Sequence, residues 1–244
     1  MNRKPSGRQY INYAFYKLSS NWYEISKNKR KNISQKLLNI LENYEKKLTL
    51  NIYSTLGIRA ECDFMLWRVS EKLELFEKMT HEVMNSGLGP YITLNYSFLS
   101  MTKHSQYVSK NKNIDQEGTR IRIKPKKRKY LIVYPFVKKV EWYLLSQKQR
   151  QKMMSEHIGT GHRYPSISIN TSYSFGIDDQ EQVVSFETDY PEDFLDLVEE
   201  MRSQKARAYT ERDVPIITCI HKDCLLYTSP SPRDRTRSRM PSSA

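Results

Sequence analysis

The sequence has few of the features that mark disulfide-bonded, zinc-binding or membrane-spanning proteins. Its 244 residues include three cysteines and no CxxC pair, which argues against a disulfide framework and against a structural zinc site. No apolar run is long enough to cross a bilayer. The basic N-terminus lacks the apolar segment and cleavage site of a signal peptide. We therefore expect a soluble, cytoplasmic protein without a membrane partner.

Positive charge is what the sequence has in excess. The net charge is +13, and lysines and arginines gather at Lys27–Lys31, Lys46–Lys47 and Lys110–Lys129. Such a surplus is compatible with nucleic-acid binding. However, no helix-turn-helix, zinc-finger or RNA-binding signature accompanies it, so we expect no nucleic-acid partner. The basic runs are interpreted as solvated surface and, at Lys110–Lys129, as a linker.

The last residues, Cys224–Ala244, resemble a translated sequencing-library adapter, because codons can be chosen for them that spell one. The alternative is a disordered tail rich in Ser, Pro and Arg. The segment holds four arginines and one aspartate, so without it the net charge falls from +13 to +10. We expect 224–244 not to be native sequence.

The two halves of the chain resemble each other. Tyr10 and the pair Trp22–Tyr23 recur as Tyr130 and Trp142–Tyr143, at a constant offset of 120 residues. Each half is expected to run strand, helix, strand, strand, helix, strand, which is the ferredoxin-like pattern. The expected fold is α+β, with duplicated ferredoxin-like units that form a dimeric α+β barrel within one chain. The expected parts are a first half with its basic linker at 1–124 and a second half at 125–223.

Local signals place several elements. Tyr130–Pro135 is expected to be a strand that its proline ends. Ser146 and Gln149 form a capping box for a helix that runs to about Gly161. In 167–175, isoleucine and aromatic residues alternate with serines, which predicts a strand with its apolar side buried. Ser70 is expected to cap a helix in the first half.

His157 is the residue of that second-half helix that could best serve as a metal ligand. It follows Met154 by three residues and Met153 by four, so the three side chains share one helix face. A histidine on an apolar face is more often a core residue than a metal ligand. The equivalent position of the first half is the apolar Leu37. The pattern alone leaves both interpretations open.

Six short motifs follow one another in the second half. They are Tyr134-Pro135-x-x-Lys138, Trp142-Tyr143, Glu156-His157, Gly161-x-x-Tyr164, Gly176-Ile177-Asp178-Asp179 and Glu200-Met201-Arg202. In order and spacing they resemble the chlorite dismutase-like family of heme proteins, most of all its coproheme decarboxylase branch. The resemblance covers Tyr130–Ile220 well and the first half more loosely. Each motif is weak alone, but six in family order are specific.

The resemblance implies an oxidoreductase that uses hydrogen peroxide to convert iron coproporphyrin III (coproheme) to heme b, with the substrate doubling as redox cofactor. His157 would ligate the iron. Tyr134 would become the radical that abstracts a hydrogen atom from a propionate, and Lys138 would lie near that propionate. Arg202 would bind a propionate and Trp142 would line the pocket. The family also implies a homo-oligomer, typically a pentamer.

Each of these residues also has a purely structural alternative. Tyr134 can be a strand-end tyrosine, and Lys138 can be an exposed loop residue. Arg202 can stabilise the end of a helix dipole. Trp142 can be a core residue.

The sequence also departs from the family pattern. Oxygen-forming chlorite dismutases carry a distal arginine that aligns here with Ile169 or, counted differently, with Asn170; strand alternation favours Ile169. Chlorite dismutation is therefore not expected. The cationic loop that includes Arg122 would attract the propionates of coproheme. Two rival functions stay open, a general heme peroxidase and a non-enzymatic heme-binding or transfer module.

Overall fold

The structure, a computed structural model, describes residues 7–107 and 122–223. The expected adapter at 224–244 and most of the basic linker lie outside this range. The first half contains β1 (Tyr10–Leu18), α1 (Asn21–Glu24), α2 (Lys27–Glu45), β2 (Thr49–Ser54), β3 (Phe64–Ser70), α3 (Glu74–Val83), η1 (Met84–Leu88), η2 (Gly89–Tyr91) and β4 (Ile92–Met101). The second contains β5 (Tyr130–Lys138), α4 (Val140–Leu144), α5 (Gln147–Gly161), β6 (Ser168–Tyr173), β7 (Gln182–Thr188), α6 (Pro191–Arg202), η3 (Lys205–Tyr209), β8 (Thr210–Arg212) and β9 (Ile217–Lys222).

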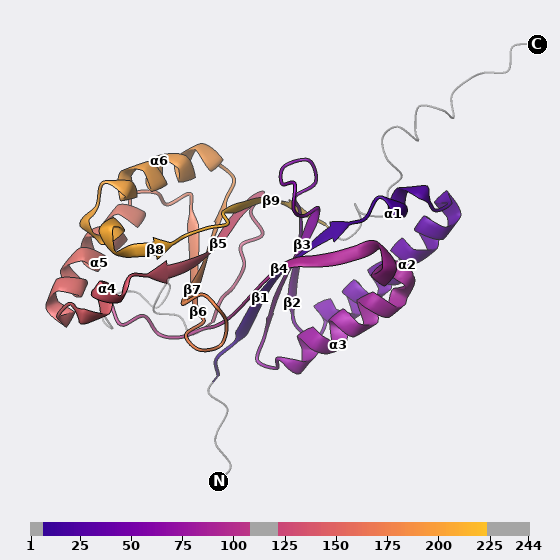
Figure 1. Ribbon diagram of the computed structural model, residues 1–244, viewed down its shortest axis with the longest axis horizontal. Helices are drawn as coiled ribbons and strands as arrows, with labels where there is room; N and C mark the ends of the chain where they lie inside the picture. Colours follow the sequence, from indigo (N-terminus) through magenta and orange to yellow (C-terminus); the bar gives the residue numbers. More distant parts are fainter. Residues whose placement is uncertain (1–6, 108–121, 224–244) are drawn as a thin grey trace, which may run out of the picture.

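All the strands belong to one antiparallel sheet, so the fold is mixed α+β. The hydrogen-bonded order is β7-β6-β4-β1-β3-β2-β9-β5-β8, and β7 also pairs with β5. The order therefore returns on itself through every strand except β8. The two halves join where β2 pairs with β9 and where β4 pairs with β6. In Figure 1 the strands lie in the middle, with α2 and α3 at one end and α4, α5 and α6 at the other.

The helices of the two halves are packed differently. In the first half a large apolar cluster fills the space between the strands and the helices, and α2 contributes the buried side chains of Ile33, Leu41 and Tyr44 to it. In the second half the corresponding cluster of the described residues is Ile167, Phe186 and Leu197. Helix α5 buries Thr160 fully and packs mainly against α6 and η3, whereas α2 also packs against β2. Helix α5 thus buries fewer of its residues than α2 does.

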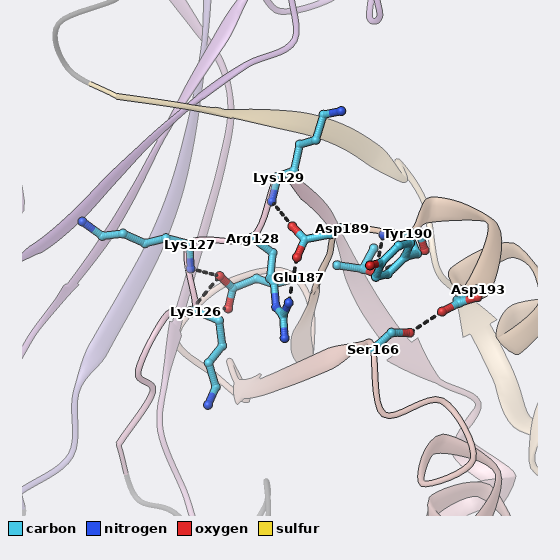
Figure 2. A network of polar contacts seen from close by, with 10 residues as sticks. Lys126, Lys127, Arg128, Lys129, Ser166, Glu187, Asp189, Tyr190 and Asp193 are labelled. Atoms are coloured by element: carbon cyan, nitrogen blue, oxygen red, sulfur yellow. Dashed lines mark hydrogen bonds and ion pairs between the residues drawn. The ribbon is translucent and has the colours of Figure 1, made fainter.

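Glu187 on β7 holds the described end of the basic linker. Its carboxylate accepts hydrogen bonds from the backbone N–H groups of Lys126 at 2.9 Å and Lys127 at 2.8 Å (Figure 2). The Asp189 carboxylate accepts one from the N–H of Lys129. Burial raises the pKa of Glu187, and these hydrogen bonds oppose that rise. The backbone of 126–129 is therefore fixed to the second half, with its lysine side chains exposed.

Several elements agree with the sequence-based expectation and others do not. The capping box of Ser146 and Gln149 is present, and α5 ends at Gly161. Pro135 does not end its strand, because β5 continues to Lys138 and Pro135 pairs with Val183. The proline is tolerated because it lies between the stretches of β5 that pair with β9 and with β8.

The start of α3 and the burial of β6 differ from the sequence-based expectation. Ser70 does not cap α3; it ends β3 opposite Tyr10, and α3 begins without a side-chain cap. In β6 the buried residue is on the serine side: Ser172 is fully buried and its Oγ lies 2.7 Å from Ser100 Oγ, whereas Ile169 and Tyr173 on the other side are half-buried. A strand order that returns on itself encloses one face of every strand, so small hydroxyl residues fill it.

Candidate functional site

Helix α5 presents His157 at its C-terminal end. The side chain is half-buried, as are Met153 and Met154 on the same helix face. Its Nδ1 lies 3.1 Å from Oε1 of Gln204, which follows α6 and is 8% exposed. The amide Nε2 of Gln204 in turn donates to Thr160 Oγ1 at 2.7 Å. His157 is therefore oriented by a chain of two hydrogen bonds.

These two hydrogen bonds set the tautomer of the imidazole. The amide oxygen of Gln204 can only accept, so Nδ1 of His157 carries the proton and donates it. No described residue bonds Nε2, whose lone pair can ligate a metal. Burial lowers the pKa of His157, the Gln204 hydrogen bond opposes this, and the positive charge of Lys138 lowers it further. The ring is thus kept neutral, the form that binds metals.

Lys138 stands beside this histidine at the end of β5. Its Nζ lies 4.5 Å from the ring centre of Trp142 and donates to the Ala206 carbonyl at 3.3 Å. Burial, followed by the Arg207 charge, lowers the pKa of Lys138 to about 8, while Glu181 opposes the change. A half-buried cation with few partners is available to a carboxylate.

Tyr134 lies four residues earlier on β5 and stacks on Phe186 at 5.8 Å. Burial raises the pKa of its phenol, and the charge of Asp213 raises it further, whereas Arg202 and Arg207 oppose this. The phenol is therefore protonated throughout the neutral range and retains its hydrogen atom.

Two arginines converge near Tyr134 on one carboxylate. Arg202 Nη1 lies 2.9 Å from Asp213 Oδ2, and Arg207 Nη1 lies 3.5 Å from the same oxygen. Two guanidinium groups sharing one carboxylate leave a net positive charge. Together with Lys138 they make this side of the site suited to anionic groups.

The apolar part of the site comes from α4, β5 and β6. Trp142 is buried and packs against Tyr107 and Tyr209. Ile169 on β6 belongs to the same cluster as Tyr134 and lies beside α5, since a Cβ added at Gly161 would meet its Cδ1 at 3.4 Å.

The two candidate distal positions take different environments. Asn170 donates to Glu187 in the linker network at 3.2 Å. Ile169 faces the apolar cluster instead. Ile169 therefore lies on the apolar side of β6, which agrees with the alignment that strand alternation favours.

The structure brings together six of the seven residues singled out in the sequence. His157, Lys138 and Trp142 form one group, and Tyr134, Arg202 and Ile169 form a second; the charge of Arg207 acts on both Lys138 and Tyr134 and so links the two. Arg122 is the exception, because it pairs with Glu71 in the first half at 2.6 Å. No described contact joins Arg122 to the others.

Sequence reasoning missed two participants. Gln204 lies 47 residues from His157 and Asp213 lies 11 from Arg202. Neither belongs to a recognisable motif, and only the folded chain places them at the site. The pairing of Arg207 with Asp213 likewise carried no sequence signal.

Comparisons with known proteins agree with one another. The family model described as chlorite dismutase matches residues 30–222. The coproheme decarboxylase of Mycolicibacterium smegmatis is 27% identical over 168 residues, which cover 68% of this chain and 70% of that protein. The chlorite dismutase of Ideonella dechloratans is 23% identical over 185 residues, 73% of this chain but less than two thirds (64%) of that protein.

Solved structures match nearly the whole chain. A mutant chlorite dismutase from Candidatus Nitrospira defluvii superposes with a TM-score of 0.82 at 22% identity, covering 90% of this chain and 94% of that one. A complex of the chlorite dismutase from the same organism with imidazole gives 0.79 at 20% identity, over 90% and 93%. At this identity the likeness shows a shared fold.

Proposed function

The chain belongs to the chlorite dismutase family, and from this premise we propose that it is a peroxide-dependent coproheme decarboxylase that makes heme b. The observation that carries the proposal is His157, half-buried, neutral and hydrogen-bonded by Gln204 so that Nε2 is available. This is the arrangement that an axial heme ligand requires.

The remaining residues fit an iron porphyrin. Half-buried apolar side chains surround the small second-half cluster, and they include Tyr164, Ile169, Val184, Phe194 and Met201. An apolar face suits a porphyrin plane, and the cations Lys138, Arg202 and Arg207 suit its propionates. When bound, the iron porphyrin would supply the redox chemistry that peroxide drives.

The chain's own residues would divide the work. Lys138 Nζ would hold the carboxylate of a reacting propionate near Tyr134. The phenol of Tyr134 would give up its hydrogen atom to the oxidant that peroxide generates and would then take one from that propionate. Loss of carbon dioxide and of one further electron to the same oxidant would leave a vinyl group. Arg202 would bind a second propionate through N–H groups that Asp213 does not use, and Trp142 would exclude water from the Lys138 side.

Ile169 favours decarboxylation over chlorite dismutation. An isoleucine at the distal position offers no cation to hold chlorite or its oxygen-transfer product. No arginine occurs between Ser166 and Asp179 to replace it. The relative with the higher identity, the Mycolicibacterium protein, is a coproheme decarboxylase by name.

One experiment separates this proposal from its rivals. Ferric coproheme is added to the protein, peroxide is titrated in, and the product mass is followed. Stepwise loss of two carboxyl groups supports the decarboxylase. Oxidation of an added dye without loss of mass would instead indicate a general heme peroxidase, and spectral binding with neither reaction would indicate a heme-binding or transfer module.

Gln204 gives a first quantitative prediction. Gln204→Leu removes the acceptor of the His157 Nδ1 proton, so the affinity for ferric coproheme should fall by about 10- to 100-fold. Gln204→Glu keeps an acceptor oxygen and should restore binding. Lys205→Gln, an exposed change at the next residue, is the control. Equal affinity for all three variants in a Soret titration would contradict the role of Gln204.

Lys138 gives a prediction about pH. A lysine with a pKa of about 8 is charged below that value and neutral above it, so it holds a carboxylate best at lower pH. Coproheme affinity should therefore decline as the pH rises through about 8, and Lys138→Gln should remove this decline. Lys139→Gln, exposed at the next position, should keep the wild-type profile. A profile unchanged by Lys138→Gln would exclude Lys138 as the titrating group.

Three further features belong to the proposal. The repeated element order supports two duplicated ferredoxin-like units forming a barrel, with the porphyrin in the half at 125–223 rather than that at 1–124. The protein would assemble as a homopentamer, as its family resemblance implies. Arg122 and the exposed lysines of the basic linker would attract the negatively charged substrate, and charge reversal there should reduce the salt dependence of coproheme binding.

A further inference from the structure

A cavity lies in the first half, among residues distinct from those around His157. It has a volume of about 440 Å³ and opens between α3 and the strands β1, β3 and β4. Its walls are mostly apolar, formed by Leu73, Phe76, Met84 and Leu99. Six polar side chains line it as well: Arg68 and Asn12 are buried, Thr80 is half-buried, and Glu77, His81 and Ser97 are exposed.

Arg68 is the unusual member of this lining, because its guanidinium is 4% exposed and has no carboxylate partner among the described residues. Nη1 donates to the Phe76 carbonyl at 3.0 Å and to Thr80 Oγ1 at 2.7 Å, and Nη2 donates to Asn12 Oδ1 at 2.5 Å. A guanidinium has five N–H groups. The N–H of Nε has no partner in the described chain but is shielded from solvent, and one N–H of Nη2 is left without a partner.

The second half shows that packing does not require this charge. On β1 and β3, Asn12 lies opposite Arg68, and at the matching place on β5 and β7, Ile132 lies opposite Phe186. Phe186 packs on Phe194 there at 4.8 Å, just as Arg68 lies 5.3 Å from the ring of Phe76. Burying a charge is costly without a counter-charge, and burial lowers the pKa of Arg68. A bound anion would therefore offset the cost of burying the guanidinium charge.

We propose that this cavity binds a small organic monocarboxylate. Its carboxylate would accept a hydrogen bond from the unused N–H of Arg68 Nη2, and its apolar part would lie against Leu73, Phe76 and Leu99. The apolar walls favour an organic body over an inorganic anion. Glu77 also lines the cavity and disfavours ions of higher negative charge such as phosphate.

Benzoate is the probe that tests the proposal, with binding to the full chain followed by calorimetry and by amide chemical shifts. Saturable binding is expected, and Arg68→Gln should weaken it by about 10- to 100-fold, the loss of a charge-assisted hydrogen bond. Lys78→Gln removes one positive charge from the exposed side of α3 and should leave benzoate binding unchanged. Benzamide, which has the same shape but no charge, should bind far more weakly.

A second variant keeps the test decisive if Arg68→Gln does not fold. Ser97→Trp places a large side chain into the cavity from an exposed strand position and should abolish benzoate binding with Arg68 intact. Neither variant should alter the coproheme Soret spectrum, which separates this site from the proposed heme site. The proposal is overturned if wild-type protein does not bind benzoate, if benzamide or phosphate binds as well, or if Ser97→Trp has no effect.

Discussion

Replacement of His157 by alanine is expected to abolish the Soret spectrum characteristic of histidine-ligated ferric coproheme. The imidazole is neutral, and its Nδ1 proton is held by Gln204, so Nε2 is the donor that the variant loses. Loss of the hydrogen-bond partner of a metal ligand typically costs about 10- to 100-fold in affinity, and loss of the ligand itself should cost at least that much. A spectral titration with ferric coproheme measures both effects.

The chain offers a matched control for this variant. His162 follows α5 directly and is exposed, so His162→Ala removes a histidine from the same region without touching the site. Added imidazole should partly restore the spectrum of His157→Ala, because it can occupy the space of the lost side chain. A wild-type spectrum in His157→Ala would show that another residue ligates the iron.

Helix α5 illustrates what a sequence can predict about the candidate site. Ser146 and Gln149 define the start of α5 through local hydrogen bonds, and the glycines Gly159 and Gly161 indicated its end. These signals act within one helix, so they can be read from neighbouring residues. Gln204 could not be found in this way, since its hydrogen bond to His157 exists only after α6 and η3 have packed beside α5.

The strands show the same limit. A period of two in 167–175 predicted a strand correctly but assigned burial to one side of it. Ser172 is buried because β6 is enclosed between β4 and β7 in a strand order that returns on itself. Pro135 likewise fits inside β5 because of which strands pair beside it. Pairing partners far apart in the chain decided both outcomes.

The unequal packing of the two halves links the fold to the proposed chemistry. In the first half, α2 packs its apolar face into the hydrophobic core, and Leu37 lies partly buried against that core. The second half leaves α5 half-buried, with His157 in place of that leucine. The half-buried face of α5 that carries His157 is where the proposed flat ligand with an apolar face would lie.

Replacement of Tyr134 by phenylalanine is expected to stop decarboxylation and to leave coproheme binding nearly unchanged. The ring stacks on Phe186 and retains this contact without its hydroxyl. Burial raises the pKa of the phenol, so the wild-type group carries a hydrogen atom that the variant cannot give up or receive. A positioned group that moves a proton supplies roughly 10²- to 10⁴-fold in rate, and the loss should be at least of this order. Product mass after peroxide addition gives the rate, and the Soret titration gives the affinity.

Tyr164→Phe separates the specific role from the presence of any tyrosine. Tyr164 belongs to the same half-buried cluster, but its hydroxyl donates to Glu200 at 3.3 Å. It should keep most of the wild-type rate, because its phenol is already bonded away from the cations Lys138, Arg202 and Arg207 that would hold the propionates. Full activity in Tyr134→Phe would remove Tyr134 from the mechanism. Equal loss in both variants would instead indicate that the cluster needs its hydroxyl groups for packing rather than for hydrogen-atom transfer.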